Sequence, residues 1–213
     1  MSIDFHRTTP FSRVFGFDRG IPVDRRYIEG FLARHADDIQ GRVLEIKDDT
    51  YTRQFGGARV HASSVLDVDA SNPRATIIDD LTAGARLVSN AYDCVILTQT
   101  LQLIFDVRAV IHTVHRILAP AGVALVTVPG ITQIPRAEAG SWYWSFSDLA
   151  MRRLFVPPFE RDAVSVSSHG NVLAATAFLY GLALHELRED ELSVADPDYP
   201  VILTVRAVKG GPS

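Results

Sequence analysis

Two apolar segments separated by an amphipathic one constrain this chain most, because they dictate how its central strands must pair. Residues 92–97 (YDCVIL) and 123–128 (VALVTV) are short runs rich in apolar and β-branched side chains, typical of strands buried on both faces. Between them, residues 107–118 carry apolar side chains at helical spacing, and Pro120 and Gly122 end that helix. Strand, helix and strand in this order form a right-handed crossover, which makes the two strands parallel neighbours.

The alternation of strands and helices extends through most of the chain. Pro22 opens a first helix, at a position where its missing N–H costs nothing. Further strands are expected at residues 43–46, 75–78, 164–166 and 201–208, and further helices at 147–155 and 171–187. This pattern predicts an α/β fold of the doubly wound kind, with a mostly parallel sheet and helices on both faces.

The loops that follow the strands are the expected ligand site. In open sheets of this kind, ligands bind beyond the carboxyl ends of the strands, where the strand order reverses. We therefore expect residues 47–53, 64–70, 79–82 and 98–102 to meet at one site. The long loop 129–146 should form the opposite wall.

Length and composition indicate one globular domain. The 213 residues are 47% apolar and 22% charged, which suits a single core, 22–208, with an N-terminal arm, 1–21, and a short tail, 209–213. The formal net charge of −4 argues against a duplex DNA or an anionic membrane as partner. The single cysteine fits a reducing cytoplasm.

Histidines and the cysteine give no metal site. His112 and His115 lie three apart on the expected helix 107–118, off its apolar stripe, and are interpreted as surface residues. Cys94 stands within an apolar strand and is interpreted as inert packing. A metal site would need more ligands within reach, so none is expected.

Two stretches of this sequence carry a family resemblance. They are GRVLEI at residues 41–46 and the segment 92–130, with its aromatic–Asp pair, its helix ending in Arg-Ile-Leu, its Pro-x-Gly turn and its strand closed by Pro. Over residues 41–130 the chain resembles the class I S-adenosylmethionine-dependent methyltransferases of the type 11 kind. The resemblance implies S-adenosylmethionine as cofactor, S-adenosylhomocysteine as product, and a seven-stranded sheet whose last strand, here 201–208, runs antiparallel.

The family's first motif is altered here. The resemblance places an acid, Glu45, at the end of the first strand, where a Gly-x-Gly turn normally follows. Lys47 and Asp49 stand at those two glycine positions. Glycine allows a left-handed backbone and close approach of a ligand, so both changes bear on cofactor binding. Lys47 could pair with the cofactor's carboxylate, which Asp49 would repel unless it points away.

After the second strand, the family uses an acid that binds the ribose hydroxyls. A gap-free reading puts Ser64 at this position. Asp67 and Asp69 stand close by and compete with Ser64 for the role. The three candidates remain open at this point.

The resemblance also implies groups for the adenine and the sulfonium. Asp80, with Asp79 beside it, would accept a hydrogen bond from the adenine amino group, and Leu81 would donate its backbone N–H to the adenine. An acid after a strand is also a common helix cap. Thr98 and Gln99 match the turn that lines the sulfonium.

His169 is the candidate catalytic base. It follows VSVSS and precedes Gly170, at the expected carboxyl end of the sixth strand. An imidazole titrates near neutral pH and can accept a hydroxyl proton. The alternative is a loop histidine that is hydrogen-bonded locally.

Candidate acceptor-binding residues come from the arm, the first helix and the long loop. Trp142 and Tyr143 belong to an aromatic cluster that is either a substrate wall or a core contact under the loop. Arg19, Asp24 and Tyr27 belong to an arm that resembles that of small-molecule methyltransferases from sugar and natural-product pathways.

The sequence therefore predicts a methyltransferase that acts on a small molecule, through an O-methyl transfer. The alternative is a methyltransferase-fold protein that no longer methylates and serves as a binding or scaffold protein, or catalyses other chemistry. A dinucleotide-dependent oxidoreductase is set aside, because no Gly-rich phosphate turn follows the first strand. We expect no nucleic-acid or membrane partner, and a homodimer stays open.

Overall fold

A seven-stranded sheet lies at the centre of the computed structural model, which describes residues 7–136 and 139–211. The strand order is β3-β2-β1-β4-β5-β7-β6, and only β7 runs antiparallel to its neighbours. This confirms the predicted fold class. The strands are β1 (Gly41–Ile46), β2 (Val60–Asp67), β3 (Ile77–Ile78), β4 (Tyr92–Thr98), β5 (Leu118–Pro129), β6 (Val164–His169) and β7 (Ile202–Val208).

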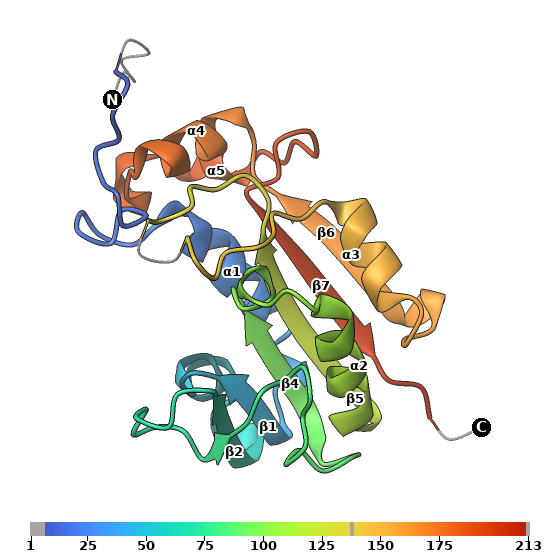
Figure 1. Cartoon of the computed structure of the whole chain (residues 1–213). Coiled ribbons are helices and arrows are strands. Elements are labelled where there is room, and N and C mark those ends of the chain that lie inside the picture. The colour runs from blue at the N-terminus through green and yellow to red at the C-terminus, as the bar shows by residue number, and fades with distance from the viewer. Residues whose placement is uncertain (1–6, 137–138, 212–213) are drawn as a thin grey trace.

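Helices cover both faces of this sheet (Figure 1). On one face, α2 (Val107–Ile117) and α3 (Asp148–Phe155) pack over β4, β5 and β7. On the other face lie α1 (Val23–Arg34), α4 (Val172–Tyr180) and α5 (Glu189–Ser193). Within the described residues, no helix has the length and apolar character needed to cross a bilayer.

Two elements differ in length from the sequence prediction. The helix expected over 171–187 ends at Tyr180, because Gly181 takes the left-handed conformation with a φ of 73° and closes the helix. The strand expected over 75–78 keeps only Ile77 and Ile78, since the Thr76 side chain takes part in the pairing and accepts from the Val65 N–H at 2.9 Å.

The β1–β2–β3 end of the sheet has little helical cover. The segment after β1 forms only a short π-helix, Thr52–Gly56, and a 3₁₀ turn, Gly57–Arg59. Residues 68–91 contain no helix at all. Four other 3₁₀ turns are Ala36–Asp38, Leu101–Leu103, Arg161–Ala163 and Leu184–Glu186. The carboxyl ends of β1 to β4 consequently face loops rather than helices.

The first six residues of the expected arm and the last two of the expected tail lie outside the described residues. The rest of the arm packs against the end of α4, where the Phe11 N–H donates to the carbonyl of Tyr180, the last residue of that helix, at 2.8 Å. Gly16 is required there, because its φ is 94° and a Cβ would lie 2.8 Å from the Leu182 carbonyl oxygen. The arm is thereby held over the carboxyl edge of the sheet.

Candidate functional site

A cavity of about 1560 Å³ opens at the carboxyl ends of β1, β2, β3 and β4. Its walls include residues from all four loops that the sequence predicted to meet. Residues of the arm, of α1 and of the 129–146 loop close the opposite side. The cavity therefore lies where a doubly wound sheet binds its ligands.

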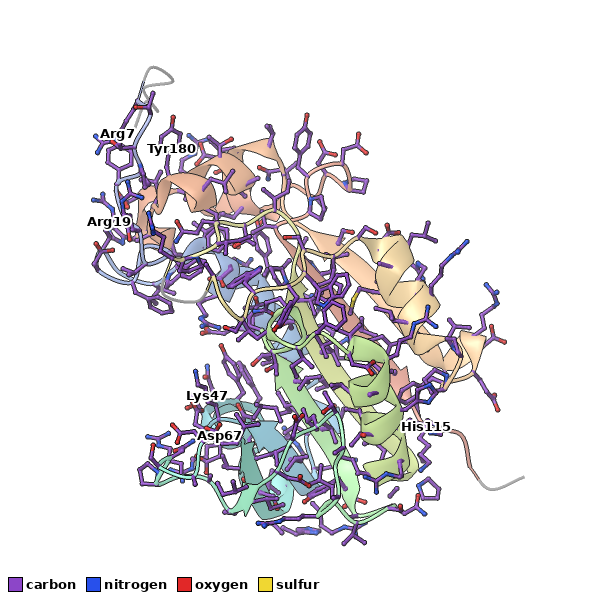
Figure 2. All side chains as sticks on the ribbon, in the orientation of Figure 1. Arg7, Arg19, Lys47, Asp67, His115 and Tyr180 are labelled. Atoms are coloured by element: carbon purple, nitrogen blue, oxygen red, sulfur yellow. The ribbon has the colours of Figure 1, made fainter. Side chains whose placement is uncertain are left out.

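Lys47 begins the loop after β1 in a conformation usually reserved for glycine. Its φ is 76°, which costs a non-glycine residue about 1–2 kcal/mol. The surrounding hydrogen bonds hold it: Lys47 N–H donates to the Leu66 carbonyl at 2.9 Å, and Asn72 Nδ2 donates to the Lys47 carbonyl at 2.7 Å. Asn72 Nδ2 also donates to Asp67 Oδ2 at 2.7 Å, and Figure 2 shows Lys47 and Asp67 as neighbours.

The Glu45 side chain holds the following residues of this loop through hydrogen bonds. Its side chain is 3% exposed and accepts from the Tyr51 N–H at 3.1 Å and from the Thr52 N–H and hydroxyl, each at 2.7 Å. Burial raises the pKa of the carboxyl, and the same hydrogen bonds oppose that rise. Glu45 thus lines the cavity floor and fixes the backbone that follows it.

Asp49 lies elsewhere than the sequence suggested. The left-handed turn at Lys47 directs Asp49 away from the cavity, where it accepts from Arg53 Nε at 2.6 Å and borders a separate hollow of about 230 Å³. Asp48 lines the main cavity instead, and its Oδ1 accepts from the Thr50 N–H at 2.9 Å. Asp48 was missed because the resemblance to the family's Gly-x-Gly turn assigns roles only to the two flanking positions.

The structure places the three candidates after β2 in different surroundings. Ser64 stands within β2, opposite Leu44, and is absent from the cavity walls, so the gap-free reading does not bring it to the cavity. Asp67 is the last residue of the strand and lines the cavity. Asp69 is exposed and bonded to Ser71, whose N–H and hydroxyl lower the pKa of its carboxyl.

Asp79 and Asp80 follow β3 and both line the cavity, yet they differ in what they bond. Asp79 accepts from the Asp80 N–H at 2.9 Å and the Arg86 N–H at 2.7 Å, one on each carboxyl oxygen. Among the described residues, Asp80 engages only its Oδ1, on the Thr82 N–H at 2.8 Å. Asp80 therefore keeps a carboxyl oxygen for a ligand. Leu81, 4% exposed, packs beside it on the cavity wall.

Thr98 and Gln99 line the cavity at the end of β4, as expected. Gln99 has a φ of 47°, and its N–H donates to the Thr127 carbonyl at 2.9 Å. Its side-chain amide donates to Thr127 Oγ1 at 3.2 Å. Gln102, one turn further, is also on the wall and is 3% exposed.

His169, the candidate base, does not reach the cavity. It does end β6, but β6 is the outermost strand, and the imidazole Nε2 lies 2.9 Å from Thr204 Oγ1 on β7. The imidazole ring stacks on the Tyr27 ring of α1, with the two ring centroids 6.1 Å apart. Burial lowers the pKa of His169 to about 4, so the ring is neutral in the folded chain. The structure thus places His169 in the packing of α1 on the sheet.

The burial of His169 predicts an acid-sensitive fold. Between pH 4 and 6.5 the unfolded chain binds more protons at this residue than the folded chain, so the free energy of unfolding falls as the pH falls through that window. We expect the melting temperature of His169→Gln to fall less over this window than that of the parent. His112→Gln, at an exposed histidine, is the matched control and should keep the parent's slope. Equal slopes for His169→Gln and parent would contradict the assignment.

Two of the residues expected to bind the methyl acceptor also lie away from the cavity. Tyr27 is buried, and its hydroxyl donates to the Leu192 carbonyl at 3.2 Å. Arg19 forms an ion pair with Glu186, with Nε 3.0 Å from Oε2, and lies on the arm in Figure 2. Both residues secure α1 and the arm to the C-terminal third of the chain.

Asp24, Trp142 and Tyr143 do line the cavity. Phe15 of the arm also lines the cavity. Its ring stacks on Trp142, with the ring centroids 6.4 Å apart, and on Phe178 of α4, with the centroids 5.8 Å apart. Phe15 was not predicted, although an aromatic residue next to Gly16 in a ligand-covering arm was a signal for it. Phe15, Trp142 and Tyr143 therefore give this side of the cavity a largely aromatic lining.

The cavity is strongly acidic. Its lining includes two basic side chains, Arg25 and Lys47, of which Arg25 donates to the Tyr51 hydroxyl at 3.0 Å. Such a lining favours a ligand with net positive charge and disfavours a pyrophosphate. Eight carboxyl side chains share the walls: Asp24, Glu29, Glu45, Asp48, Asp67, Asp79, Asp80 and Asp106.

Comparison with solved structures finds the same fold in many methyltransferases. A SAM-dependent methyltransferase from Archaeoglobus fulgidus superposes with a TM-score of 0.59 at 10% identity, over 87% of this chain and 94% of the other. The plantazolicin methyltransferase BamL, in complex with a triazolic desmethylPZN analog and SAH, gives 0.58 at 14% identity, over 92% and 88%. The [4+2]-cyclase SpnF gives 0.55 at 13% identity, over 84% and 82%.

Comparisons of sequence give no such match. No family model matches the chain, and no curated protein matches it. The fold is therefore that of the class I S-adenosylmethionine-dependent methyltransferases, recognised in three dimensions at identities of 10–14%.

Proposed function

We propose that this chain, with its methyltransferase fold, binds S-adenosylmethionine in the acidic cavity and transfers the methyl group to a small molecule. The observation that carries the proposal is the lining itself, eight carboxyl groups against two basic ones at the carboxyl edge of the sheet. S-adenosylmethionine has a sulfonium and an ammonium group against one carboxylate, and is a net cation. A dinucleotide has an anionic pyrophosphate, which this lining would repel.

The residues present fit the adenosine part of the cofactor. Asp67, at the end of β2, would accept hydrogen bonds from the ribose hydroxyls through lone pairs left beside its bonds from the Asp69 N–H and Asn72 Nδ2. Asp80 would accept a hydrogen bond from the adenine amino group through the oxygen that its own loop does not use. Leu81 would supply the backbone N–H beside it, and Thr98 and Gln99 would lie along the sulfonium. When bound, the cofactor supplies an electrophilic methyl group.

The methionine part of the cofactor would meet an unusual loop. With Asp49 turned away, the repulsion that it could exert on the cofactor's carboxylate is removed. Lys47 is exposed and lines the cavity, so its ammonium group is the cation available to that carboxylate. The left-handed backbone that glycine normally supplies is kept by Lys47 itself.

We expect Lys47→Ala to weaken binding of S-adenosylmethionine and S-adenosylhomocysteine by about tenfold, the loss of one charge-assisted pair. Asparagine tolerates the left-handed backbone, so Lys47→Asn separates charge from conformation and should lose as much. Calorimetric titration measures both. Tighter binding by the two variants would mean that Lys47 obstructs the site.

The acceptor is proposed to be a small natural-product or sugar-like molecule, methylated on oxygen. The aromatic side chains on the cavity lining support such a ligand, as does the occurrence of this fold in the plantazolicin methyltransferase BamL. Transfer of a methyl group is an in-line displacement, so the protein mainly aligns the two partners and excludes water. A cytoplasmic location remains a prediction.

A thermal-shift comparison tests the proposed cofactor. A ligand at about 100 times its dissociation constant stabilises a fold by about 2.7 kcal/mol, which is several degrees for a chain of this size. We expect S-adenosylmethionine and S-adenosylhomocysteine to raise the melting temperature and NAD to leave it unchanged. A shift with NAD alone would overturn the proposal.

A second candidate is chemistry without methyl transfer at the same site. The altered glycine positions support it, as does the same fold in a [4+2]-cyclase. Such a protein would bind the cofactor yet give no methylated product. Mass spectrometry of acceptor mixtures incubated with methyl-labelled S-adenosylmethionine separates the two functions.

A further inference from the structure

Three buried polar atoms lack a hydrogen-bond partner in the described part of the chain. They are Asp24 Oδ1, Gln102 Oε1 and Trp142 Nε1. Each such atom costs about 1–3 kcal/mol, and folded proteins leave few of them. All three residues line the cavity at the carboxyl ends of the strands. Their gathering at a single site indicates that a ligand supplies the missing partners.

Asp24 is the most costly of the three, because it is a carboxyl group. It lies in the first turn of α1 and is only 8% exposed. Burial raises the pKa of its carboxyl, while Arg25 and the first-turn backbone N–H groups oppose the rise. The Arg25 guanidinium is engaged elsewhere, with Nη1 3.0 Å from the Tyr51 hydroxyl. Asp24 Oδ1 is therefore a buried acceptor without a donor, on a residue that lines the cavity.

Apolar side chains of the arm share the cavity lining with Asp24. Ile21 and Pro22 precede it along the cavity wall, and Phe15 lies on the same wall. The Phe15 ring is nearly parallel to Trp142, at 21°, and to Phe178, at 25°. Stacked rings offer planar faces, against which a planar ligand gains the most contact.

We infer that the methyl acceptor is a planar, mainly apolar molecule whose hydroxyl or amino group donates a hydrogen bond to Asp24 Oδ1. This inference rests on the proposed function. It favours a planar natural product over a sugar-like acceptor, and the test below decides between oxygen and nitrogen as the methylated atom. Oδ1 of Asp24 is then placed to take the proton of that group. Gln102 Oε1 would accept a second donor from the ligands, and Trp142 Nε1 would donate to an acceptor atom.

Three naphthalene probes of nearly equal shape test the inference by calorimetry, without turnover. They are 1-naphthol, 1-aminonaphthalene and 1-methylnaphthalene, which has no donor. We expect at least one donor probe to bind about tenfold tighter than 1-methylnaphthalene, which is one hydrogen bond to a buried carboxyl. Whichever of 1-naphthol and 1-aminonaphthalene binds more tightly then indicates whether the methyl group is transferred to oxygen or to nitrogen.

Variants of Asp24 test whether its side chain causes the tighter binding of the donor probe. Asp24→Ala should abolish the tenfold preference, whereas Asp24→Asn, which keeps an acceptor oxygen, should retain most of it. Glu29→Ala, a carboxyl group removed further along α1 on the same cavity, is the matched control and should keep the preference. Removal of an unpartnered buried acceptor should also leave the melting temperature of Asp24→Ala at or above that of the parent.

Three results would overturn the inference: no binding of any probe, no preference for a donor probe, or a preference that survives in Asp24→Ala. The titrations are run with and without S-adenosylhomocysteine. Because the probes need no cofactor to enter the acceptor side, failure of S-adenosylhomocysteine to bind would count against the proposed function alone.

Discussion

Replacing Glu45 with alanine is expected to lower the free energy of unfolding by about 2–4 kcal/mol, since it leaves two buried backbone N–H groups and one hydroxyl without an acceptor. The same variant should bind S-adenosylmethionine at least about tenfold more weakly, because the loop that carries Lys47 loses its anchor. Thermal denaturation and calorimetry on one preparation measure both effects.

Glu45→Gln is the informative companion. It keeps one acceptor oxygen for the Thr52 groups but presents an NH₂ group to the Tyr51 N–H, so its losses should be about half those of Glu45→Ala. If both variants melt and bind like the parent, Glu45 does not hold the loop. If they lose stability but not affinity, the loop does not touch the cofactor.

The double variant Asp67→Ala, Asp80→Ala is expected to weaken binding of S-adenosylhomocysteine by about a hundredfold. Each substitution removes an acceptor from a polar group of adenosine, worth about tenfold, and the two residues would contact different parts of the ligand, so their effects should add. The matched controls are Asp69→Ala, at an exposed acid off the cavity, and Ser64→Ala, within β2. An affinity within about twofold of the parent would show that the adenosine binds elsewhere.

The fold could be predicted from the sequence because its strongest signals are periodic and local. The buried strands β4 and β5 and the stripe of α2 are readable from the spacing of apolar residues. The end of α4 at Gly181 was missed, because a glycine within an apolar helical pattern can either be tolerated or close the helix.

The candidate site was predicted less completely, for a physical reason. Which loops meet follows from the topology, so Glu45, Asp67 and Asp80 were candidates, and all three line the cavity. Which way a side chain points depends on backbone turns such as the left-handed Lys47, which exchanges Asp49 for Asp48 at the cavity. His169 was placed correctly at a strand end, yet its distance from the cavity depends on strand order, which the sequence does not state.

One measurement tests the central claim most directly: calorimetric titration of the parent chain with S-adenosylmethionine. We predict one bound molecule per chain with a dissociation constant of about 100 µM or tighter, competed by S-adenosylhomocysteine and weakened in Asp80→Ala. No binding at about 1 mM, or binding that S-adenosylhomocysteine does not compete, would contradict the assignment of this cavity to the cofactor.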